Sequence, residues 1–352
     1  MTEAVLRDNT HPRKKGLKWP PGSLVIIPLI MGALVNTFVP EVLNVGSFTS
    51  ALFRDGAGAL LGLFFFCMGA QIDFRSGPIA IEKGAAICIG KVAAGVTVGL
   101  CTAFYVKGGN LWGLSPLAII AAMTNSNATL FAALTKEFGN KSDQGAVAMI
   151  TFNEGPFVTL VALGAAGLAT FPYAVLIGLL LPLILGFIVG NVSSKARAFV
   201  APGEMLLIPF LGFIVGRGIN FKSLITAGLQ GIPLGLMTVC LSGGAAIGCL
   251  YLVHVIRGRP VRARNVVAGA AEATTAGNAI ATPAAVALVD PSYHAIQSVA
   301  TSQVAAATVT TALLVPLFVL WVSRWQASRG TTPEAEDAWN FRSDDTEQLI
   351  IA

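Results

Sequence analysis

The stretch AAMTNSNATL, Ala121–Leu130, interrupts an apolar run that extends from Leu117 to Leu134. The run is long enough to enter a membrane, yet its middle carries polar side chains, which are poor helix formers because they compete for the backbone's own hydrogen bonds. These side chains are Thr124, Asn125, Ser126, Asn127 and Thr129. Because hydrocarbon offers no partner to a free peptide group, non-helical backbone at this depth must be buried in protein or line a cavity. We therefore predict a transmembrane helix that is broken near the membrane midplane.

A second polar interruption lies far downstream at residues 271–283, AEATTAGNAIATP, again inside an apolar run. Secondary transporters bind substrate between two discontinuous helices that occupy corresponding positions in two halves of the chain. The two interruptions together therefore predict a transporter whose site lies where two broken helices cross. The alternative is a pair of unrelated Ser/Thr-rich helices that pack closely.

The composition is that of a membrane protein. Of 352 residues, 54% are hydrophobic and 12% are charged, and the mean hydropathy is +0.72; a soluble domain carries about 25% charged residues. We predict an all-α polytopic protein surrounded by the lipid bilayer, with no nucleic-acid partner despite the net charge of +5. The cysteines lie in apolar segments without ligand-like spacing, so we expect small buried side chains rather than disulfides or a metal site. They are Cys67, Cys88, Cys101, Cys240 and Cys249.

Ten apolar segments approach the length of about 20 residues that crosses a bilayer. They cover residues 23–40, 51–72, 79–106, 115–135, 145–170, 173–191, 204–219, 223–254, 265–289 and 294–323. The seventh is short and the eighth is long. We expect a first five-helix repeat over 23–170 and a second over 173–325, between a tail at 1–22 and a tail at 326–352. Because the chain after Ser328 is acidic and without apolar periodicity, we expect it to be disordered.

The basic residues predict the orientation, because cytoplasmic loops carry the excess of Lys and Arg. With ten spans and the N-terminus inside, most of the 23 Lys and Arg residues fall on the cytoplasmic side. Only Arg54, Lys107, Arg217 and Lys222 fall outside, and Lys91 lies within a span. We therefore expect a multi-pass protein of the bacterial inner membrane with both termini in the cytoplasm.

The two halves repeat in sequence. IPLIMGALV at Ile27–Val35 matches LPLILGFIV at Leu181–Val189, and FCMGAQIDFRS at Phe66–Ser76 matches FIVGRGINFKS at Phe213–Ser223. Because each half has an odd number of spans, the second must enter the membrane from the opposite face, which makes an inverted repeat in which helices 4 and 9 are the broken, crossing pair. Glycines four apart predict close helix packing. They occur in GFIVG at Gly186–Gly190 and Gly212–Gly216, and also as the pairs Gly58 and Gly62, Gly231 and Gly235, and Gly244 and Gly248.

Ionisable groups at membrane depth cost about 2.5–3.5 kcal/mol on insertion scales and are therefore candidates for function. Glu154 and its neighbour Asn153 stand where Gly155 and Pro156 break the fifth span. Pro removes a backbone donor and leaves a carbonyl free. We expect Glu154 and Asn153 to take part in ion coupling, with Glu154 carrying a proton or binding Na⁺; the alternative is a salt-bridged structural carboxylate.

Two further charges belong to this group. Glu272 opens the break in the ninth span and is either a second coupling site or a residue of the cytoplasmic mouth beside Arg262 and Arg264. Lys91 lies 12 residues into the span that starts at Ile79, about 18 Å deep at 1.5 Å per residue. This depth prevents easy snorkelling. Lys91 is therefore expected to pair with an intramembrane carboxylate or to meet an anionic substrate.

Neutral polar side chains in the interrupted spans and in the tenth span are the candidate substrate ligands. Together with half-helix N-termini, whose dipoles favour anions, they are suited to a hydroxylated carboxylate. Individually, each could equally bond a neighbouring helix. The candidates are Asn125, Ser126, Asn127, Thr129, Thr274, Thr275, Asn278, Thr301 and Gln303.

At these residues the chain resembles the 2-keto-3-deoxygluconate permease family of bacteria, from about Pro21 to Arg324. The resemblance rests on FFCMGAQI (Phe65–Ile72), AAMTNSNATLFAAL (Ala121–Leu134) and NEGPFVTL (Asn153–Leu160) taken together. It implies proton-coupled uptake of 2-keto-3-deoxygluconate and the ten-helix inverted-repeat fold of bile-acid sodium symporters. The residues that match the family's expected pattern are Lys91, Asn125, Glu154, Gly155 and Pro156.

These observations predict a secondary active transporter that imports a small sugar-acid anion with H⁺, and the alternative is a Na⁺-coupled symporter of another small organic anion. We expect no cofactor besides the coupling ion, no metal site, and no enzymatic activity, because no nucleophile–base set or carboxylate pair stands out at membrane depth. A channel is the remaining rival class, and it would show no counterflow. A homo-oligomer is compatible with the sequence.

Overall fold

The structure is a computed structural model, and it describes residues 23–71, 77–169, 173–217 and 221–340. These residues form helices joined by short loops, with no strand beyond one isolated bridge between Leu111 and Leu114. The expectation of an all-α chain is confirmed. The N-terminal tail, the residues after Asn340 and parts of the repeated motifs (72–76 and 218–220) lie outside the described residues.

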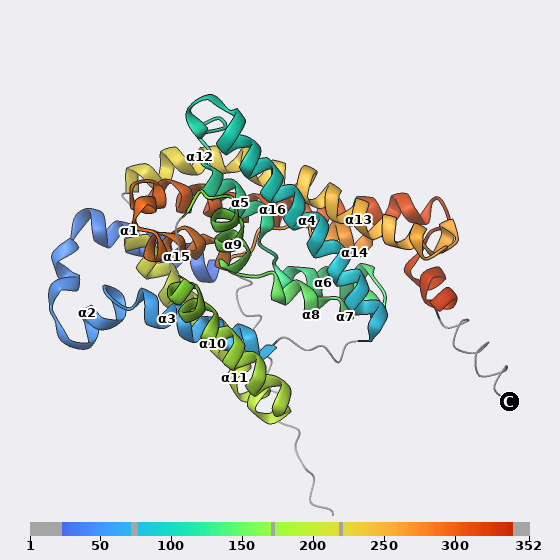
Figure 1. Cartoon of the computed structure of the whole chain (residues 1–352), viewed down its shortest axis with the longest axis horizontal. Coiled ribbons are helices and arrows are strands. Elements are labelled where there is room, and N and C mark those ends of the chain that lie inside the picture. Colours follow the sequence, from blue (N-terminus) through green and yellow to red (C-terminus); the bar gives the residue numbers. More distant parts are fainter. Residues whose placement is uncertain (1–22, 72–76, 170–172, 218–220, 341–352) are drawn as a thin grey trace, which may run out of the picture.

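The helices follow the predicted apolar segments (Figure 1). In the first half they are α1 (Ser23–Phe38), α2 (Ser47–Phe53), α3 (Ala57–Gln71), α4 (Pro78–Tyr105), α5 (Pro116–Thr124), α6 (Ala128–Phe138), α7 (Lys141–Gly145), α8 (Val147–Phe152) and α9 (Phe157–Ala165). In the second half they are α10 (Tyr173–Val192), α11 (Ser194–Arg217), α12 (Phe221–Met237), α13 (Gly243–Ile256), α14 (Val267–Ala271), α15 (Thr282–Val289) and α16 (His294–Ala327).

Five of the described helices are long and apolar enough to cross a membrane, or six if the bent pair α2 and α3 counts as one span. They are α4, the α5–α6 pair, α11, the α12–α13 segment and α16. Shorter apolar helices lie at Ile27–Phe38, Leu181–Val192 and Asn278–Val289. The chain is thus a multi-pass helical membrane protein, whereas the count of ten spans remains a prediction.

The predicted breaks are present in three segments. The chain leaves the helix between α5 and α6, which we call the first break. The second break lies between α14 and the 3₁₀ turn Asn278–Ala281 (η5) that precedes α15, and the third break lies between α8 and α9. The eighth segment is long, as expected, because α12 continues through the π-helical turn Thr238–Ser242 into α13.

The seventh segment was predicted to be short, and this was wrong, because α11 begins at Ser194 and runs for 24 residues. Lys195, Arg197 and Pro202 made this stretch look like a loop. The Ser193 hydroxyl instead accepts a hydrogen bond from Ala196 N at 3.2 Å, and Arg197 Nε donates to Gly190 O at the end of α10 at 3.0 Å. A capping hydroxyl and a guanidinium on free carbonyls stabilise both helix ends.

The helices gather in two groups. α1 packs along α11, and α3 packs along both α10 and α11, so these helices form one bundle. α4 packs against α5 and α13, α12 against α16, and α14 against α13 and α16; together with α6 to α9 and α15 they form a core bundle. Figure 1 shows α3, α10 and α11 on one side of the molecule and α4, α13 and α14 on the other. The breaks between α5 and α6, between α8 and α9 and after α14 all lie in the core bundle.

Glycines set the spacing within the first bundle. A Cβ built on Gly216 of α11 would lie 2.0 Å from Leu29 O of α1, and a Cβ on Gly69 of α3 would lie 2.1 Å from Leu183 O of α10. Real side chains do not approach backbone this closely, so the two helix pairs require hydrogen at these positions. The expected small-residue packing is confirmed there. It is wrong for Gly58, where an added Cβ would meet nothing within 4 Å.

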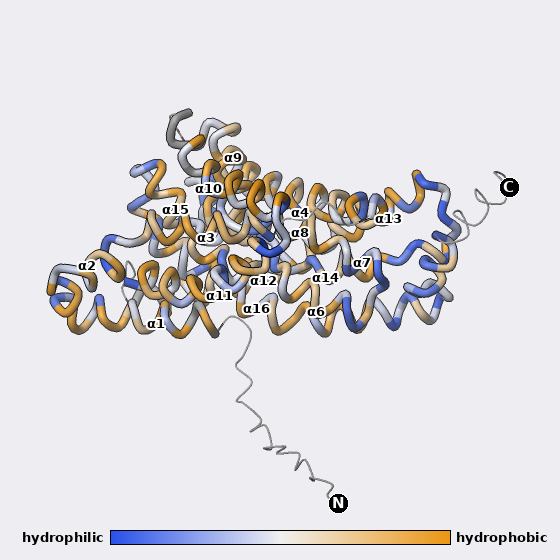
Figure 2. Tube along the Cα trace, turned by 90° about the horizontal axis from the view of Figure 1, so that it is seen from below, coloured by the Kyte–Doolittle hydropathy of each residue, from blue (hydrophilic) through white to orange (hydrophobic). Residues whose placement is uncertain are grey.

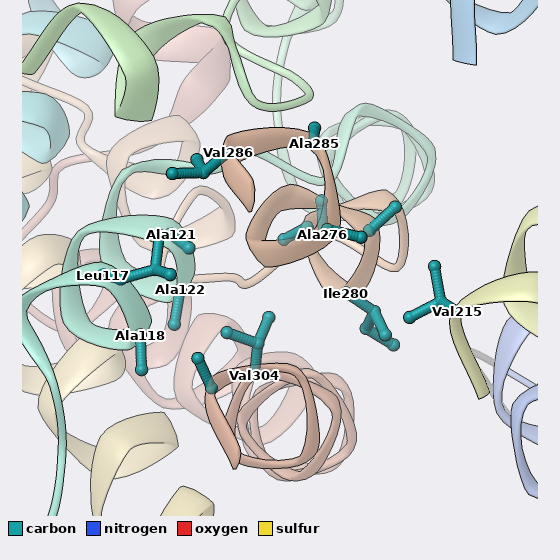
Figure 3. Packing of buried hydrophobic residues seen from close by; sticks show 14 of the residues in the cluster. Leu117, Ala118, Ala121, Ala122, Val215, Ala276, Ile280, Ala285, Val286 and Val304 are labelled. Atoms are coloured by element: carbon teal, nitrogen blue, oxygen red, sulfur yellow. The ribbon is translucent and has the colours of Figure 1, made fainter. Parts of the chain in front are cut away.

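The core bundle is packed with small apolar side chains near the crossing. Figure 3 shows Ala121 and Ala122 of α5, Ala276 of the second break and Val304 of α16 converging on one another. All of them are buried. Alanines let the backbones of two broken helices come close, which positions their free peptide groups for contact.

Two smaller predictions need correction. The chain after Ser328 was expected to be disordered, but residues 333–340 form a helix that packs on the core bundle and buries Glu336. Cys101 and Cys240 were expected to be buried, but they are exposed on the surfaces of their helices, whereas Cys67 is buried. Hydropathy alone does not separate a lipid-facing position from a buried one. Figure 2 shows apolar residues along most helices and hydrophilic ones gathered at the end near the C-terminus.

Candidate functional site

The first break consists of residues 125–127 between α5 and α6. Asn125 has extended backbone (φ −71°, ψ 133°), which ends α5. Asn127 then starts the next half-helix, because its Oδ1 accepts a hydrogen bond from Leu130 N at 3.0 Å. The sequence TNSN therefore both ends one half-helix and caps the following one, as side chains that bond local backbone are expected to do.

Asn153 satisfies the backbone that this break sets free. Its Nδ2 donates to Thr124 O at 2.7 Å and to Ser126 Oγ at 2.8 Å, while its backbone carbonyl accepts from Ser126 N at 3.2 Å. Asn153 is buried and lies at the end of α8, where the third break begins. Asn153 was predicted to take part in ion coupling. In the structure its hydrogen bonds connect the first break to the third.

The second break meets the first one directly. Asn127 N donates to Thr274 Oγ1 at 3.2 Å, and Thr275 Oγ1 donates to Ala122 O at 2.9 Å. All of these residues except the half-buried Asn127 are buried. Two segments about 150 positions apart in sequence thus exchange hydrogen bonds, so the first and second breaks contact each other, and we call this contact region the crossing.

Lys91 of α4 joins this crossing with a buried ion pair. Its Nζ lies 2.9 Å from Glu272 Oε1, 2.9 Å from Glu272 O and 2.6 Å from Thr274 O. Both side chains are 0% exposed. The ammonium has three N–H donors, and each has an oxygen within reach. The expectation that Lys91 pairs with an intramembrane carboxylate is confirmed, and Glu272 lies at the crossing rather than beside Arg262 and Arg264.

Glu154 bridges the two broken helices. Its Oε1 accepts from Ala128 N, the first residue of α6, at 2.5 Å, and its Oε2 accepts from Asn278 Nδ2 at 3.4 Å. Gly155, with φ of +86°, turns the chain directly after this carboxylate. The N-terminus of a helix attracts anions through its free N–H groups and its dipole. The carboxylate is therefore held at an anion position between the first and second breaks.

Some predicted ligands lie elsewhere. Thr129 is exposed on α6, so the structure does not bring it into the crossing. Gln303 of α16 donates to Gly113 O at 2.9 Å and to Gln230 Oε1 at 2.7 Å, which ties α16 to α12 and to the loop before α5. Thr301 is buried on α16, and its Oγ1 has no hydrogen-bond partner. Thr301 thus stays a candidate, whereas Gln303 has a structural contact.

Several contributors were missed by the sequence analysis. Thr308 Oγ1 of α16 donates to Ala276 O at 3.0 Å, and Thr311 Oγ1 accepts from Thr275 N at 3.0 Å. Ser242 Oγ donates to Met123 O at 3.0 Å from the π-helical turn. Each is a hydroxyl in a mainly apolar segment, a weak signal because such groups commonly bond their own helix. Their role here is to satisfy the broken backbone.

Glu204 of α11 is a further carboxylate that the sequence analysis passed over. It is half-buried on this helix of the first bundle. An acidic residue in the middle of an apolar helix was the available signal.

Beside the second and third breaks, the space at the boundary between the two bundles is nearly closed. A cavity of about 10 Å³ lies between α3 and α11 on one side and Pro156, Asn278 and Ile280 on the other. That volume is about what one water needs, so a larger ligand would fit there only if the bundles separated. Asn125 Oδ1 and Asn278 Oδ1 are buried without a hydrogen-bond partner. Buried polar atoms of this kind point to a ligand or a second conformation.

Comparison with known proteins now identifies the family. A profile of the 2-keto-3-deoxygluconate permease family matches residues 14–328. The chain belongs to this permease family. 2-Keto-3-deoxygluconate permease 1 of Salmonella typhimurium (strain LT2) is 42% identical over 318 residues, which cover 90% of this chain and 98% of the relative. The 2-keto-3-deoxygluconate permease of Bacillus subtilis (strain 168) is 38% identical over 321 residues, covering 89% and 94%.

A third relative, the 2-keto-3-deoxygluconate permease of Xanthomonas axonopodis pv. citri, is 36% identical over 317 residues, covering 88% of this chain and 97% of the relative. The match runs through all three breaks and ends at α16, so the permease family covers the whole candidate site. The resemblance inferred from the sequence motifs is confirmed, and with it the assignment to membrane transport.

Proposed function

We propose that this permease imports 2-keto-3-deoxygluconate, or a closely related sugar acid, by symport with H⁺. The substrate class follows from the names of the relatives. The observation that supports the coupling is the position of Glu154, whose carboxylate is held at the N-terminus of α6 and contacts Asn278 of the second broken helix. A group that carries a removable charge thus occupies the place best suited to an anion.

Glu154 and a substrate carboxylate would compete for the same N–H groups. While Glu154 is ionised, its Oε1 accepts the hydrogen bond of Ala128 N. Protonation removes the charge that the α6 N-terminus attracts and frees this N–H for the substrate anion. The sugar acid and the proton would then bind together, which is what coupled transport requires. Asn125, Ser126, Asn127, Thr274, Thr275, Asn278 and Thr301 remain the proposed neighbours of the bound sugar acid, in or beside the breaks.

The surroundings of Lys91 favour H⁺ over Na⁺. Three oxygens at 2.6–2.9 Å, two of them backbone carbonyls of the second break, surround its ammonium as they would surround a small cation. The protein supplies this cation itself, and its charge balances that of Glu272. The alternative is a Na⁺-coupled symporter of another organic anion, and the buried unpartnered oxygens of Asn125 and Asn278 favour it.

Alternating access would arise from movement of the core bundle against the bundle of α1, α3, α10 and α11. The small cavity between α3 and α11 on one side and Pro156, Asn278 and Ile280 on the other lies along this boundary. The equivalent glycine contacts in the α1–α11 and α3–α10 pairs support a ten-span inverted repeat. We propose an inner-membrane location with both termini in the cytoplasm, as the distribution of Lys and Arg favours.

The test is substrate counterflow in proteoliposomes that contain the purified permease. We expect labelled 2-keto-3-deoxygluconate to exchange against unlabelled substrate, and to accumulate when the lumen is alkaline and Na⁺ is absent. The substrate proposal fails if no counterflow and no measurable binding occur. Accumulation that follows a Na⁺ gradient and ignores the pH gradient supports the Na⁺ alternative, and passive equilibration without counterflow identifies a channel.

A further inference from the structure

A buried cluster of charged and polar side chains lies apart from the crossing, where α4 and α14 begin and α13 ends. At its centre is Glu336 of the helical residues 333–340, and its side chain is 0% exposed. Its Oε1 lies 3.0 Å from Lys83 Nζ and 2.5 Å from Arg259 Nη1. Its Oε2 lies 2.8 Å from Lys83 Nζ, 2.8 Å from Asn140 Nδ2 and 3.2 Å from Asn265 Nδ2.

The four donor residues come from four parts of the core bundle. Lys83 is on α4, Asn140 precedes α7, Arg259 follows α13 and Asn265 precedes α14. Lys83 and Arg259 are 1% and 4% exposed. Both oxygens of one planar carboxylate are therefore surrounded by N–H donors from segments that are distant in sequence, and this arrangement is specific for a carboxylate.

Contacts that do not involve Glu336 hold these donors in place. Asn140 caps α7, and its backbone N donates to Asp143 Oδ2 at 3.1 Å. Asn265 Oδ1 accepts from Val267 N at 3.1 Å, at the start of α14, and its Nδ2 also donates to Asp143 Oδ2 at 2.8 Å. The donors are thus positioned by the bundle itself, and the site is built independently of the segment that fills it.

The charges of this cluster balance only when the Glu336 carboxylate is present. Lys83 pairs with Asp143 as well as with Glu336, and Arg259 pairs with Glu336. Without Glu336, two cations would share one carboxylate, and the buried amides of Asn140 and Asn265 would each lose an acceptor. Leaving buried charges and donors unpaired is strongly unfavourable. An empty site would therefore attract an anion.

The segment that carries Glu336 follows a short turn and makes polar contacts with the core bundle. Gly330, with φ of +74°, turns the chain after α16. Thr331 Oγ1 donates to Val261 O at 3.1 Å, and the Arg259 guanidinium lies 5.6 Å from the centre of the Trp339 ring. Polar contacts of this kind are regained in water when a segment leaves, so they confer position more than net stability.

We propose that Lys83, Asn140, Arg259 and Asn265 form a carboxylate-binding site for which Glu336 is a tethered ligand. A small free carboxylate occupies this site when the tethered one is removed. Through Asn265 the site also fixes the start of α14, the half-helix that ends at Glu272. The site is separate from the proposed substrate pathway, and its existence does not depend on the substrate or on the coupling ion.

The experiment is chemical rescue of the full-length Glu336→Ala variant in detergent. The variant is purified in acetate, and its thermal unfolding is followed while acetate is exchanged for chloride at constant ionic strength. We expect the midpoint to fall as acetate is removed and to rise again, with saturation, when acetate or formate returns, because a ligand that binds only the folded state stabilises it. Glu336→Gln retains the side-chain volume and keeps the site filled, so acetate should not stabilise it.

Glu334→Ala is the matched control, because Glu334 is exposed on the same helical segment. We expect the wild type and this control to give the same midpoint in acetate and in chloride. The proposal is overturned if Glu336→Ala responds equally to acetate, chloride and sulfate, or if acetate stabilises the wild type to the same extent as the variant. A response that also survives Arg259→Gln in the Glu336→Ala background would overturn it too, because that change removes a donor of the site.

Discussion

Lys91 and Glu272 lie 181 positions apart in the sequence, and they form an ion pair with an Nζ–Oε1 distance of 2.9 Å. Both side chains are fully buried in the core bundle. The pair attaches the unbroken helix α4 to the break that follows α14. It neutralises two charges that the interior would otherwise exclude. Because the ammonium also reaches the carbonyls of Glu272 and Thr274, the same side chain satisfies backbone that the break sets free.

Removing one partner of this pair should be costly. We expect Lys91→Met to destabilise the permease by about 3–5 kcal/mol, since it leaves a buried carboxylate unpaired. The double variant Lys91→Met with Glu272→Gln should recover part of this loss, because no charge remains unpaired. Thermal unfolding in detergent measures both effects in a double-mutant cycle. Lys136→Met, at an exposed position of α6, is the control, and an equal loss in both single Lys variants would contradict the prediction.

Glu154→Gln should separate binding from coupling. The amide resembles the protonated acid, so we expect the variant to bind substrate and to catalyse counterflow while losing accumulation driven by a pH gradient. Uptake under a gradient and counterflow are measured in the same proteoliposomes. Glu137→Gln, an exposed acidic residue of α6, should keep both activities. Full gradient-driven uptake by Glu154→Gln would remove Glu154 from the coupling mechanism.

The glycine contacts of the α1–α11 and α3–α10 pairs should respond alike when a methyl group is added to the glycine. A Cβ on Gly216 or Gly69 would overlap backbone oxygen of the facing helix, so we expect each Ala substitution to cost about 1–3 kcal/mol of stability. At Gly58 and Gly248 an added Cβ meets nothing within 4 Å, and Ala there should be neutral or stabilise by up to about 1 kcal/mol. Thermal unfolding of the four variants tests this. A loss at Gly216 without a loss at Gly69 would argue against equivalent roles in an inverted repeat.

The packing of residues 333–340 on the core bundle, which we call docking, should change in stability with pH because of Asp337. Burial raises the pKa of Asp337, and the nearby Glu336 and Asp143 carboxylates act in the same direction, while Lys83 and Lys141 oppose them. A carboxyl whose pKa is raised in the docked state favours docking most below its ordinary pKa of about 3.9. This contribution is lost as pH rises through the raised value.

We therefore expect Asp337→Asn to protect residues 333–340 better than the wild type at pH 7 and about equally at pH 4. Hydrogen exchange of this segment, read by mass spectrometry, is the measurement. Glu334→Gln removes the same charge from an exposed position and should leave the pH profile unchanged. Protection that is identical in the wild type and in Asp337→Asn at pH 7 would show that Asp337 does not oppose docking.

The positions of the breaks could be predicted because the signal is local. Thr124 to Asn127 and Glu272 to Asn278 place polar side chains inside apolar runs, and lipid does not tolerate free peptide groups. The start of α11 could not be predicted, because Ser193 and Arg197 act as caps that resemble a loop in sequence. Glu336 was missed for a related reason: an acidic tail gives no sign that a basic site elsewhere will receive it.

The sequence by itself determined that this is a helical membrane protein that resembles the permease family, where its helices break, and that Glu154, Glu272 and Lys91 are ionisable residues in or beside apolar segments. Only the tertiary structure decided the partners: Glu154 with Ala128 and Asn278, and Lys91 with Glu272. The reason is physical. A low-dielectric interior requires every charge and peptide group to be satisfied, and this requirement is visible in the sequence, but the group that satisfies it is chosen by helix packing between segments far apart along the chain.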